Sequence, residues 1–517
     1  MRSACHLRLL TGASVAAYAV VVTFLAVNAA AADEKMPRPR TVVDFGNPQA
    51  FTLYPQQAEA AIVASKSGPV LQVTTEAKAS WPGVNIIPRE GKWDLAGFDR
   101  VEMGVVNPQD VPVRVLLSID NPGSDGRQHC NVESVTVGPG QRRTLVVPFG
   151  TWHGELSHPL DQTNIVSLKV FLDQPGRAHR FVVENIRAVP FDRSAMKEVF
   201  ADPFYVHLAP PFGRGINLGN MLDAPPNADW AMVLRPEYFG VIKKAGFDSV
   251  RIPVRWPDYA LPFAPYRMNA AFFSRVDEAV RQALDQQLQV VLDMHYYDQL
   301  MQLPAAHRER FLAIWRQIAE HYRDYSGQVA FELLNEPIKN LSAELWNALV
   351  VDALAVIRPT NPDRCVVVGP VGWNSIRELE ALELPENDRH LIVTVHYYEP
   401  FHFTHQGAAW MGPESRGWLG TKWLGTPAEH RAVQRDFDTA ITWAVKHRRP
   451  LYLGEFGAFD RADLDSRARW TRYVAEQAVE RKIGCGYWEF CAGFGAYDPL
   501  RNTWIEPLKN ALLSSGR

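Results

Sequence analysis

Eight short apolar segments recur along the C-terminal part of the chain, and a stretch with helical spacing follows each of them. The apolar segments span residues 214–219, 249–255, 289–295, 329–336, 365–370, 391–398, 451–457 and 485–490. Stretches between them, such as 275–287 and 308–325, carry apolar residues three and four positions apart, which is the spacing of one helix face. Strands that are apolar almost throughout are buried on both faces, as in parallel sheets. The pattern predicts an α/β fold, a (β/α)8 TIM barrel. A doubly wound open sheet is the alternative, disfavoured because no Gly-rich phosphate loop follows the first strand.

The preceding region has a different pattern. From about residue 41 to residue 190, short alternating runs are separated by Gly, Pro, Asn and Asp, and no helical spacing stands out. This pattern is typical of an antiparallel β-sandwich of the jelly-roll kind. We therefore predict a β-sandwich domain over residues 33–195 and a barrel domain over residues 196–517.

The first 32 residues are predicted to be a signal peptide. Arg2 and Arg8 form a cationic start, an uncharged stretch follows from Leu9, and the small residues Ala30 and Ala32 precede the first acidic residue. A retained membrane anchor is the alternative, because about 20 apolar residues also span a bilayer. We expect cleavage, a secreted or periplasmic protein, and no stable membrane association afterwards.

Composition narrows the possible partners. Hydrophobic residues make up 47% and charged residues 21% of the chain, and the formal charge is −3. No basic block is present, so a nucleic-acid partner has no electrostatic support. The cysteines that follow the signal segment lie far apart and have no metal-ligand spacing. We expect a monomer that uses neither a metal nor a cofactor.

Polar residues collect at the ends of the predicted barrel strands. In strand order they are Arg251, His295, Asn335, Glu336, His396, Tyr398, Glu455 and Trp488. Active sites of such barrels lie at the C-terminal ends of the strands. A lone residue of this kind is usually a satisfied core group, but polar groups on six strands indicate a site.

Two carboxylates beside an aromatic platform suggest glycoside hydrolysis. That reaction needs one carboxyl group protonated, to donate to the leaving oxygen, and another ionised, to attack the anomeric carbon or to activate water. Arg251 is placed to lower the pKa of one glutamate by its charge, while burial raises the pKa of the other. Trp488 offers a flat face to a sugar ring.

Seven motifs make the resemblance specific, and together they cover about residues 200–517. They are GRGINLGNMLDAP, GFDSVRIPVRW, VVLDMH, ELLNEP, VTVHYYEPFHFTHQGAAW, LYLGEFGAF and GYWEF. In this order they resemble glycoside hydrolase family 5, the cellulase family of the retaining barrel clan. The segment FTHQGAAW is similar to a branch of that family that acts on β-1,4-glucans, glucomannans and mannans.

The resemblance implies roles for individual residues. Glu336 would be the general acid/base and Glu455 the nucleophile of a retaining double displacement. Asn335 would bind the sugar 2-hydroxyl, and Tyr398 with Arg251 would hold the nucleophile ionised. Further implied contacts are His295 and His396 at the reacting subsite, Trp488 as its floor, and Asn220, Asp223, Trp230 and Trp410 at more distant sugars.

One residue departs from the family pattern. Relatives of this branch often carry two consecutive histidines after the third strand, whereas Tyr296 follows His295 here. An imidazole is thereby replaced by a phenol near the substrate, which leaves the choice of polysaccharide backbone open.

The expected function is that of an exported endo-acting β-1,4-glycanase, foremost an endoglucanase. Alternatives are a β-mannanase, glucomannanase or xyloglucan-active enzyme, and an enzyme that trims exopolysaccharide or transfers glycan. A non-catalytic polysaccharide-binding protein is the alternative from another class. The sandwich region resembles carbohydrate-binding modules weakly. Trp81, Trp93 and Trp152 are its candidate platforms, but packing is an equal alternative for each, as is a purely structural domain.

Overall fold

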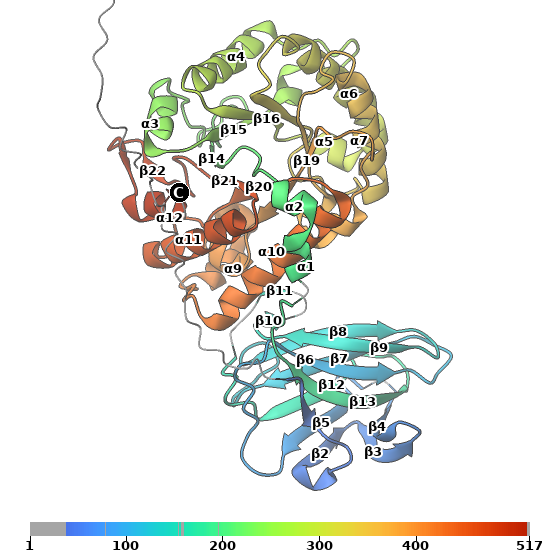
Figure 1. Ribbon diagram of the computed structural model, residues 1–517. Coiled ribbons are helices and arrows are strands. Elements are labelled where there is room, and N and C mark those ends of the chain that lie inside the picture. Colours follow the sequence, from blue (N-terminus) through green and yellow to red (C-terminus); the bar gives the residue numbers. More distant parts are fainter. Residues whose placement is uncertain (1–37, 78, 153–154, 157–159, 195, 514–517) are drawn as a thin grey trace, which may run out of the picture.

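The computed structural model describes residues 38–77, 79–152, 155–156, 160–194 and 196–513. The predicted signal peptide, residues 1–32, lies outside these residues. Figure 1 shows two bodies, a sandwich of antiparallel sheets and a closed barrel with helices around it. Among the described residues, no helix is long and apolar enough to cross a bilayer. The predicted fold class, a barrel preceded by a sandwich, is confirmed.

The sandwich consists of a six-stranded and a seven-stranded sheet. The six-stranded sheet has the order β3-β4-β13-β6-β9, with β1 paired to β13, and the other sheet has the order β11-β10-β8-β7-β12-β5-β2. In β7, Val113, Val115, Leu117 and Ile119 point into the core between the sheets. This spacing of two is the alternation that strands require when one face is buried.

The strand bounds of the sandwich are β1 Arg40–Val43, β2 Phe51–Gln56, β3 Ala58–Ser65, β4 Gly68–Thr75, β5 Gly83–Pro88, β6 Arg100–Val106, β7 Val113–Asp120, β8 Cys130–Val137, β9 Arg142–Pro148, β10 Thr151–Trp152, β11 Glu155–Leu156, β12 Ser167–Phe171 and β13 Arg180–Val189. A short 3-10 helix, η1, spans Pro48–Ala50.

Eight parallel strands close the barrel in sequence order. They are β14 Arg214–Asn217, β15 Ser249–Val254, β16 Gln289–Met294, β17 Val329–Glu332, β18 Val366–Val368, β19 Leu391–Tyr397, β20 Leu451–Phe456 and β21 Gly484–Tyr487. Each lies inside a predicted apolar segment or begins within one residue of it. A two-stranded hairpin follows, formed by β22 Tyr497–Asp498 and β23 Thr503–Trp504.

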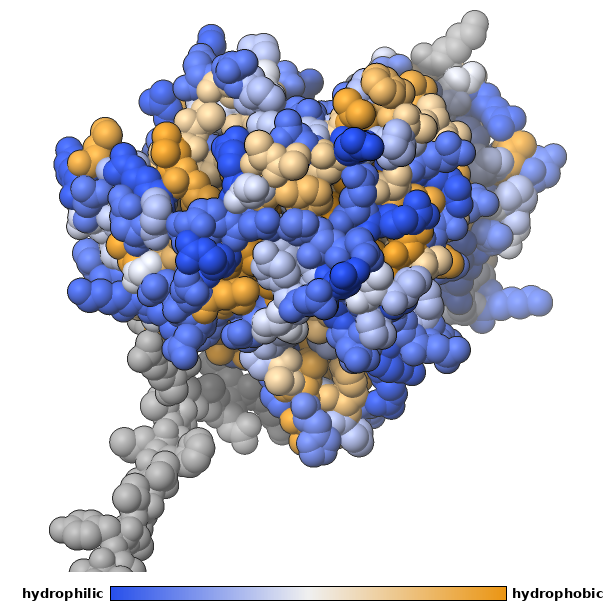
Figure 2. All heavy atoms as spheres, turned by 90° about the horizontal axis from the view of Figure 1, so that it is seen from above, coloured by the Kyte–Doolittle hydropathy of each residue, from blue (hydrophilic) through white to orange (hydrophobic). Residues whose placement is uncertain are grey.

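Helices surround the barrel, with hydrophobic faces turned inward. The α-helices are α1 Met196–Ala201, α2 Pro203–His207, α3 Glu237–Ala245, α4 Ala270–Asp285, α5 Asp298–Gln302, α6 Pro304–His321, α7 Ala343–Ile357, α8 Val371–Asn374, α9 Phe401–Thr404, α10 Pro427–His447, α11 Leu464–Glu480 and α12 Glu506–Leu513. The 3-10 helices are η2 Trp256–Tyr259, η3 Ile376–Ala381, η4 Ala409–Met411 and η5 Pro413–Trp418. Seen from above, the barrel presents mainly hydrophilic side chains, with hydrophobic ones in separate patches (Figure 2).

Two details differ from the predicted pattern. Strand β17 ends at Glu332 rather than at residue 336, because the chain leaves the sheet before Asn335 and takes a left-handed conformation at Glu336 (φ 47°). After β18, the expected helix is only the short turn α8 and the 3-10 helix η3.

The sandwich lies against the barrel at α10, as Figure 1 shows. Buried Asp99 of the sandwich forms ion pairs with Arg431, at 3.8 Å, and with Arg435, both on α10. In the connecting segment, Arg193 donates to both carboxylate oxygens of Asp438 at 2.7 and 2.9 Å. A cavity of about 560 Å³ remains between Phe149 and the start of α10. Charged contacts therefore hold the two bodies together along one helix.

Candidate active site

The predicted polar residues meet at the C-terminal mouth of the barrel. Arg251 lies inside β15, His396 inside β19 and Glu455 inside β20. His295, Tyr398 and Trp488 each follow the last residue of a strand. Asn335 and Glu336 come from the loop after β17, where the backbone N–H of Asn335 donates to the carbonyl of Met294 at 2.9 Å.

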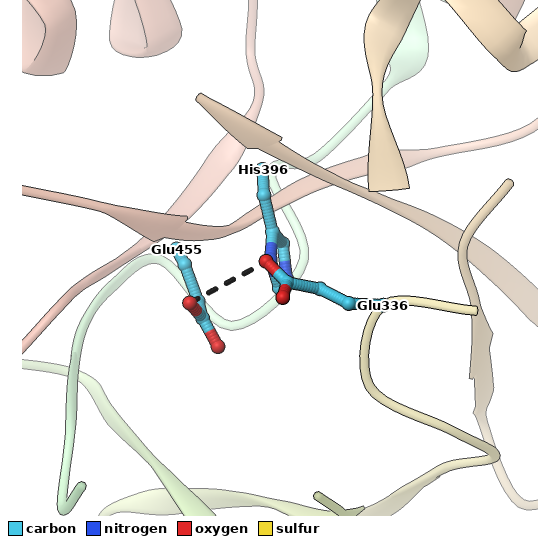
Figure 3. A group of neighbouring side chains, drawn as sticks. All are labelled: Glu336, His396 and Glu455. Carbon is cyan, nitrogen blue, oxygen red and sulfur yellow. Dashed lines mark hydrogen bonds and ion pairs between the residues drawn. The ribbon is translucent and has the colours of Figure 1, made fainter. Parts of the chain in front are cut away.

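Glu336 and Glu455 face each other with His396 between them, as Figure 3 shows. His396 Nδ1 lies 2.8 Å from Glu336 Oε1 and 3.6 Å from Glu455 Oε2. One carboxylate oxygen of each glutamate and one ring nitrogen of His396 all lie within 4.8 Å of one another. Two carboxyl groups at this separation can act on opposite sides of one small reacting group.

Arg251 is the fully buried centre of the site. Its Nη1 donates to Glu455 Oε1 at 2.8 Å, and its Nε and Nη2 donate to the two oxygens of Glu332 at 2.7 and 2.8 Å. Nη2 also donates to Asn335 Oδ1 at 2.8 Å. Burial by itself lowers the pKa of Arg251, but Asp293, Glu332 and Glu455 outweigh it and raise the pKa well above its ordinary value. The guanidinium is therefore charged and fixed in orientation.

Tyr398 holds the other oxygen of Glu455. Its hydroxyl donates to Glu455 Oε2 at 2.8 Å. Burial, and then the charge of Glu455, raise the pKa of Tyr398 well above its usual value, so the phenol keeps its proton. Both oxygens of Glu455 thus accept hydrogen bonds, which favours the ionised carboxylate that a nucleophile requires.

Glu336 is in a different environment. Burial raises the pKa of Glu336 to about 7, and the charge of Glu332 acts in the same direction against that of Arg251. Burial lowers the pKa of His396 to about 4, so its ring is neutral. Asn374 Nδ2 lies 3.2 Å from His396 Nε2 and can donate to it, which leaves the ring hydrogen on Nδ1 beside Glu336. A carboxyl group with this pKa retains its proton below about pH 7, as a general acid must.

An aromatic wall completes the mouth of the barrel. The rings of His295 and Trp488 are nearly parallel, 2° apart in tilt, with centroids separated by 5.2 Å. Tyr296 packs its ring edge-on against His295 at 4.5 Å and lies under the Arg255 guanidinium, at 4.4 Å. The phenol that departs from the family pattern is therefore held in place next to this wall.

The four residues predicted to contact distant sugars differ in exposure. Trp230 is 48% exposed and Trp410 58% exposed, and Asn220 is partly exposed. Asp223, in contrast, is buried, and its Oδ1 accepts a hydrogen bond from the backbone N–H of Met221 at 2.9 Å. Its Oδ2 is buried and has no hydrogen-bond partner among the described residues, so the predicted sugar contact of Asp223 stays a prediction.

Several residues of the site were not predicted. Glu332 and Asp293 are buried and contact Arg251, and Asn217 Oδ1 accepts a hydrogen bond from the same guanidinium at 3.0 Å. Charged residues within otherwise apolar strands are the signal that could have identified the two acids. Trp373, in the turn after β18, is 61% exposed. This turn lies beside the loop of Glu336, because the N–H of Gly372 donates to the carbonyl of Pro337 at 2.9 Å.

Glu336, His396 and Glu455 also form a group of described residues that could hold a metal ion. The same atoms already bond to one another and to Tyr398 and Arg251. The predicted roles of acid and nucleophile would account for the group without a metal, and the expectation that no metal or cofactor takes part stays a prediction.

Comparison with known proteins agrees with this geometry. The family model described as cellulase (glycosyl hydrolase family 5) matches residues 224–493. Endoglucanase H of Acetivibrio thermocellus is 36% identical over 322 residues, which are 61% of this chain and 34% of that protein. This chain spans about a third of the length of the first two curated relatives it matches.

Two solved structures are similar over the barrel. Thermotoga maritima Cel5A in complex with mannotriose is 47% identical, with a TM-score of 0.57, and the match covers 58% of this chain and 97% of that one. The cellulose synthase subunit Z of Clostridioides difficile is 39% identical, with a TM-score of 0.57, and the match covers 58% of this chain and 99% of that one.

These matches confirm the resemblance that the seven motifs indicated. The family model covers more than half of the 517 residues and includes both glutamates of the site. The chain therefore belongs to the cellulase family, glycosyl hydrolase family 5.

Proposed function

We propose that this protein is an endo-acting β-1,4-glucanase that hydrolyses its substrate with retention of configuration. The observation that carries the proposal is the pair of glutamates, with one oxygen of each within 4.8 Å of the other. Retaining enzymes have carboxyl groups about 5–5.5 Å apart, whereas inverting enzymes keep about 6.5–9.5 Å for a water molecule. The membership in a family of cellulases and the endoglucanase relatives support the choice of reaction.

In the first step, the carboxylate of Glu455 attacks the anomeric carbon and forms a glycosyl ester. The bond from that carbon to the leaving oxygen breaks, and Glu336 transfers its proton to this oxygen. The assigned states match the geometry, because Glu455 accepts hydrogen bonds from Arg251 and Tyr398, and burial raises the pKa of Glu336 to about 7.

In the second step, water replaces Glu455 on the anomeric carbon. Glu336, now ionised, takes a proton from the attacking water, the ester bond breaks, and the carboxylate of Glu455 is restored. Two inversions give retention. Asn335 is held by Arg251, at 2.8 Å, where it can bind the 2-hydroxyl of the reacting sugar.

The proposal also covers which polysaccharide backbone the enzyme cleaves. We propose β-1,4-glucan, with glucomannan and mannan as competing substrates. The supporting observation for glucan is the set of endoglucanase relatives. The Thermotoga structure with mannotriose favours testing mannans as well, because that enzyme is similar over the same barrel. Tyr296, fixed beside His295, is the residue expected to influence the choice.

A biosynthetic role is a second candidate. The cellulose synthase subunit of Clostridioides difficile is 39% identical to this chain, which supports an enzyme that trims or transfers glucan during its production. The residues are the same in both cases, since a sugar in place of water at the ester gives transglycosylation. Products formed at high acceptor concentration distinguish the two roles: longer oligosaccharides indicate transfer, and shorter ones alone indicate hydrolysis.

We further propose that the sandwich binds glycan on the outer face of its seven-stranded sheet. Tyr54 and Trp81, each about half exposed, lie on this face. Trp81 packs edge-on against Phe171 of β12, with centroids 6.0 Å apart. Asn85 is the register partner of both Tyr54 and Lys169, and its buried Oδ1 has no hydrogen-bond partner in the described part of the chain.

Affinity for insoluble cellulose tests this role of the sandwich. Trp81→Ala combined with Tyr54→Ala should lower the bound fraction while hydrolysis of a short soluble substrate stays unchanged. Trp93→Ala is less suited to this test, because Trp93 packs against the sandwich core. If the double variant binds insoluble cellulose as well as the wild type does, the sandwich is a structural domain.

Export is proposed from the sequence of the first 32 residues. Expression of the full chain in a bacterial host should give a product that begins at or near Asp33 outside the cytoplasm. Recovery of the intact N-terminus in the membrane fraction would instead support the anchor. We propose that the mature protein is a monomer, which its mass in light scattering tests.

The decisive experiment for the reaction is hydrolysis of carboxymethylcellulose, β-glucan and glucomannan by the wild type and by Glu455→Ala. The variant should lose several powers of ten in turnover. Added azide should restore turnover and give a glycosyl azide of inverted configuration. No reducing-end release by the wild type from any polymer would refute the enzyme and favour a polysaccharide-binding protein. Near-normal turnover of the variant would refute the role of Glu455.

A further inference from the structure

Asp293 is a buried acid that the proposed reaction does not use directly. It lies on β16 with its side chain inside the barrel, below the mouth. Its Oδ2 is 2.7 Å from His295 Nδ1 and 3.0 Å from Arg251 Nη2. Its Oδ1 is buried and has no hydrogen-bond partner among the described residues. One oxygen of Asp293 therefore faces both the charge of Arg251 and the ring of His295.

The contact at Nδ1 determines what His295 presents at its other nitrogen. Burial lowers the pKa of His295 to about 4, so the ring is neutral above that pH and carries one hydrogen. Burial also raises the pKa of Asp293 to about 7. At pH 8 the carboxylate is therefore ionised and can only accept a hydrogen bond. The ring hydrogen must then lie on Nδ1, and Nε2 is left with a lone pair.

Nε2 has no hydrogen-bond partner in the part of the chain that the structure describes. The His295 ring is stacked on Trp488, the proposed floor for the reacting sugar. An acceptor fixed in this position matches a donor on the sugar, and the donors of a glucan are its hydroxyl groups.

We propose that Asp293 is a positioning residue that makes His295 a hydrogen-bond acceptor toward one hydroxyl group of the sugar at the reacting subsite. The inference rests on the proposed glucanase function. It goes beyond that function because it assigns a direction to one hydrogen bond and names the residue that sets it. The competing explanation is that Asp293 only balances the charge of Arg251.

Substrates that lack a single hydroxyl group separate these explanations. The probes are aryl β-cellobiosides whose reacting ring is intact or lacks the 3- or the 6-hydroxyl, measured at pH 8. For one probe, wild type should lose about tenfold in kcat/KM relative to the intact substrate, the size of one neutral hydrogen bond. D293A should lose most of this discrimination, because His295 is then free to take the other tautomer.

D293N is the conservative variant. Its amide should place the carbonyl oxygen where Oδ2 lies, because the positively charged Arg251 Nη2 is 3.0 Å from that position and favours an oxygen there over an NH2 group. It therefore keeps an acceptor for Nδ1 without the negative charge, and its discrimination should stay within about twofold of wild type. A residue that only balanced charge would show the reverse: D293N and D293A would lower kcat/KM equally for every probe and leave the ratio unchanged. That result would overturn the proposal.

Thr394→Ala is the matched control for truncation inside the barrel. Thr394 is buried in β19, and its Oγ1 has no partner among the described residues. This variant should leave the ratio between intact and deoxy probes as it is in the wild type. A change in the ratio as large as that of D293A would show that any truncation of the interior disturbs the site, and would refute the specific role of Asp293.

A spectroscopic measurement tests the proposal without turnover and without any Asp293 variant. Wild type labelled with ¹⁵N in its histidine rings should show His295 protonated at Nδ1 and unprotonated at Nε2 at pH 8, with His295→Gln used for assignment. The opposite tautomer would overturn the proposal. Because this readout needs no hydrolysis, failure of the positioning role and failure of the glucanase function remain distinguishable.

Discussion

Arg251 and Glu455 form an ion pair inside the barrel, with Nη1 2.8 Å from Oε1 and both side chains buried. The guanidinium also donates to Glu332 through Nε and Nη2, so a second carboxylate fixes its plane. A lysine has no planar fork and cannot bond two carboxylates in this way. Arg251→Lys should therefore lower kcat on a soluble glucan by roughly 100- to 1,000-fold, as the loss of a preorganised charge contact does.

Arg281→Lys is the control for this substitution. Arg281 forms ion pairs with Glu278 and Asp285 on the exposed side of α4, at the outer surface. Its replacement should leave both kcat and thermal stability nearly unchanged, because exposed pairs contribute about 0–1 kcal/mol. A kcat of Arg251→Lys within a few-fold of wild type would contradict the assigned role.

Tyr398 and its neighbour Tyr397 provide a matched pair of hydroxyl deletions. Tyr398 donates to Glu455 Oε2 at 2.8 Å, whereas Tyr397 points to the other side of β19 and donates to Asp436 Oδ2 at 2.9 Å. Tyr398→Phe should lower kcat by about 10- to 100-fold, because a hydrogen bond to a charged group contributes about 1.5–3 kcal/mol. Tyr397→Phe should lower the melting temperature but retain kcat. Equal loss of kcat in both would show that the effect is structural.

The pH profile follows from the environment of Glu336. Burial raises the pKa of this carboxyl to about 7, and only its protonated form can donate to the leaving oxygen. kcat/KM should therefore be high below pH 7 and fall as the pH rises through about 7, where Glu336 ionises. His396 does not titrate in this range, since burial lowers its pKa to about 4. Asp293 does, since burial raises its pKa to about 7 as well, so the decline must be assigned with a Glu336 variant.

The choice of leaving group checks this assignment. A dinitrophenyl cellobioside needs no proton to depart, so Glu336→Gln should cleave it in the first step and show no alkaline decline. The same variant should be nearly inactive on polymeric glucan. If the alkaline decline persists in Glu336→Gln, another group is responsible for it.

The barrel could be predicted from the sequence because its strands are local and nearly all apolar, as in the segment that becomes β16. The two glutamates of the candidate site could be predicted because Glu336 ends one such segment, Glu455 lies within another, and both fall in recognisable motifs. The strand order of the sandwich could not be predicted, because β13 pairs with β4 and β6, which lie far from it in sequence.

The buried acids that contact Arg251 could not be predicted for the same reason, because they come together only in the folded chain. Asp293 and Glu332 are register partners on adjacent strands, and both reach Arg251 from the interior. In a one-dimensional pattern they are merely charged interruptions of apolar runs. The left-handed conformation of Glu336 likewise has no signal in the sequence, because φ values above zero are uncommon for residues other than Gly, Asn and Asp.

Trp373 is expected to bind the part of the polysaccharide that leaves first. It is 61% exposed, and its turn is bonded to the loop of Glu336 through Gly372 and Pro337. Three consecutive residues, Gly372, Trp373 and Asn374, have φ values of 70°, 61° and 56°. A bulky side chain in this left-handed conformation costs roughly 1–3 kcal/mol, which indicates that the exposed ring serves a function.

Two substitutions separate the ring from the backbone strain. Trp373→Gly suits the left-handed conformation and removes the ring, whereas Trp373→Phe keeps an aromatic face in the same conformation. Trp373→Gly should raise the melting temperature and raise KM for cellopentaose about three- to tenfold, the range expected for one aromatic contact. KM for an aryl cellobioside, whose leaving group is not a sugar, should change much less. Trp373→Phe should lie between wild type and Trp373→Gly on the longer substrate. If both substrates lose affinity equally, the ring acts on the shape of the Glu336 loop, and a sugar does not stack on it.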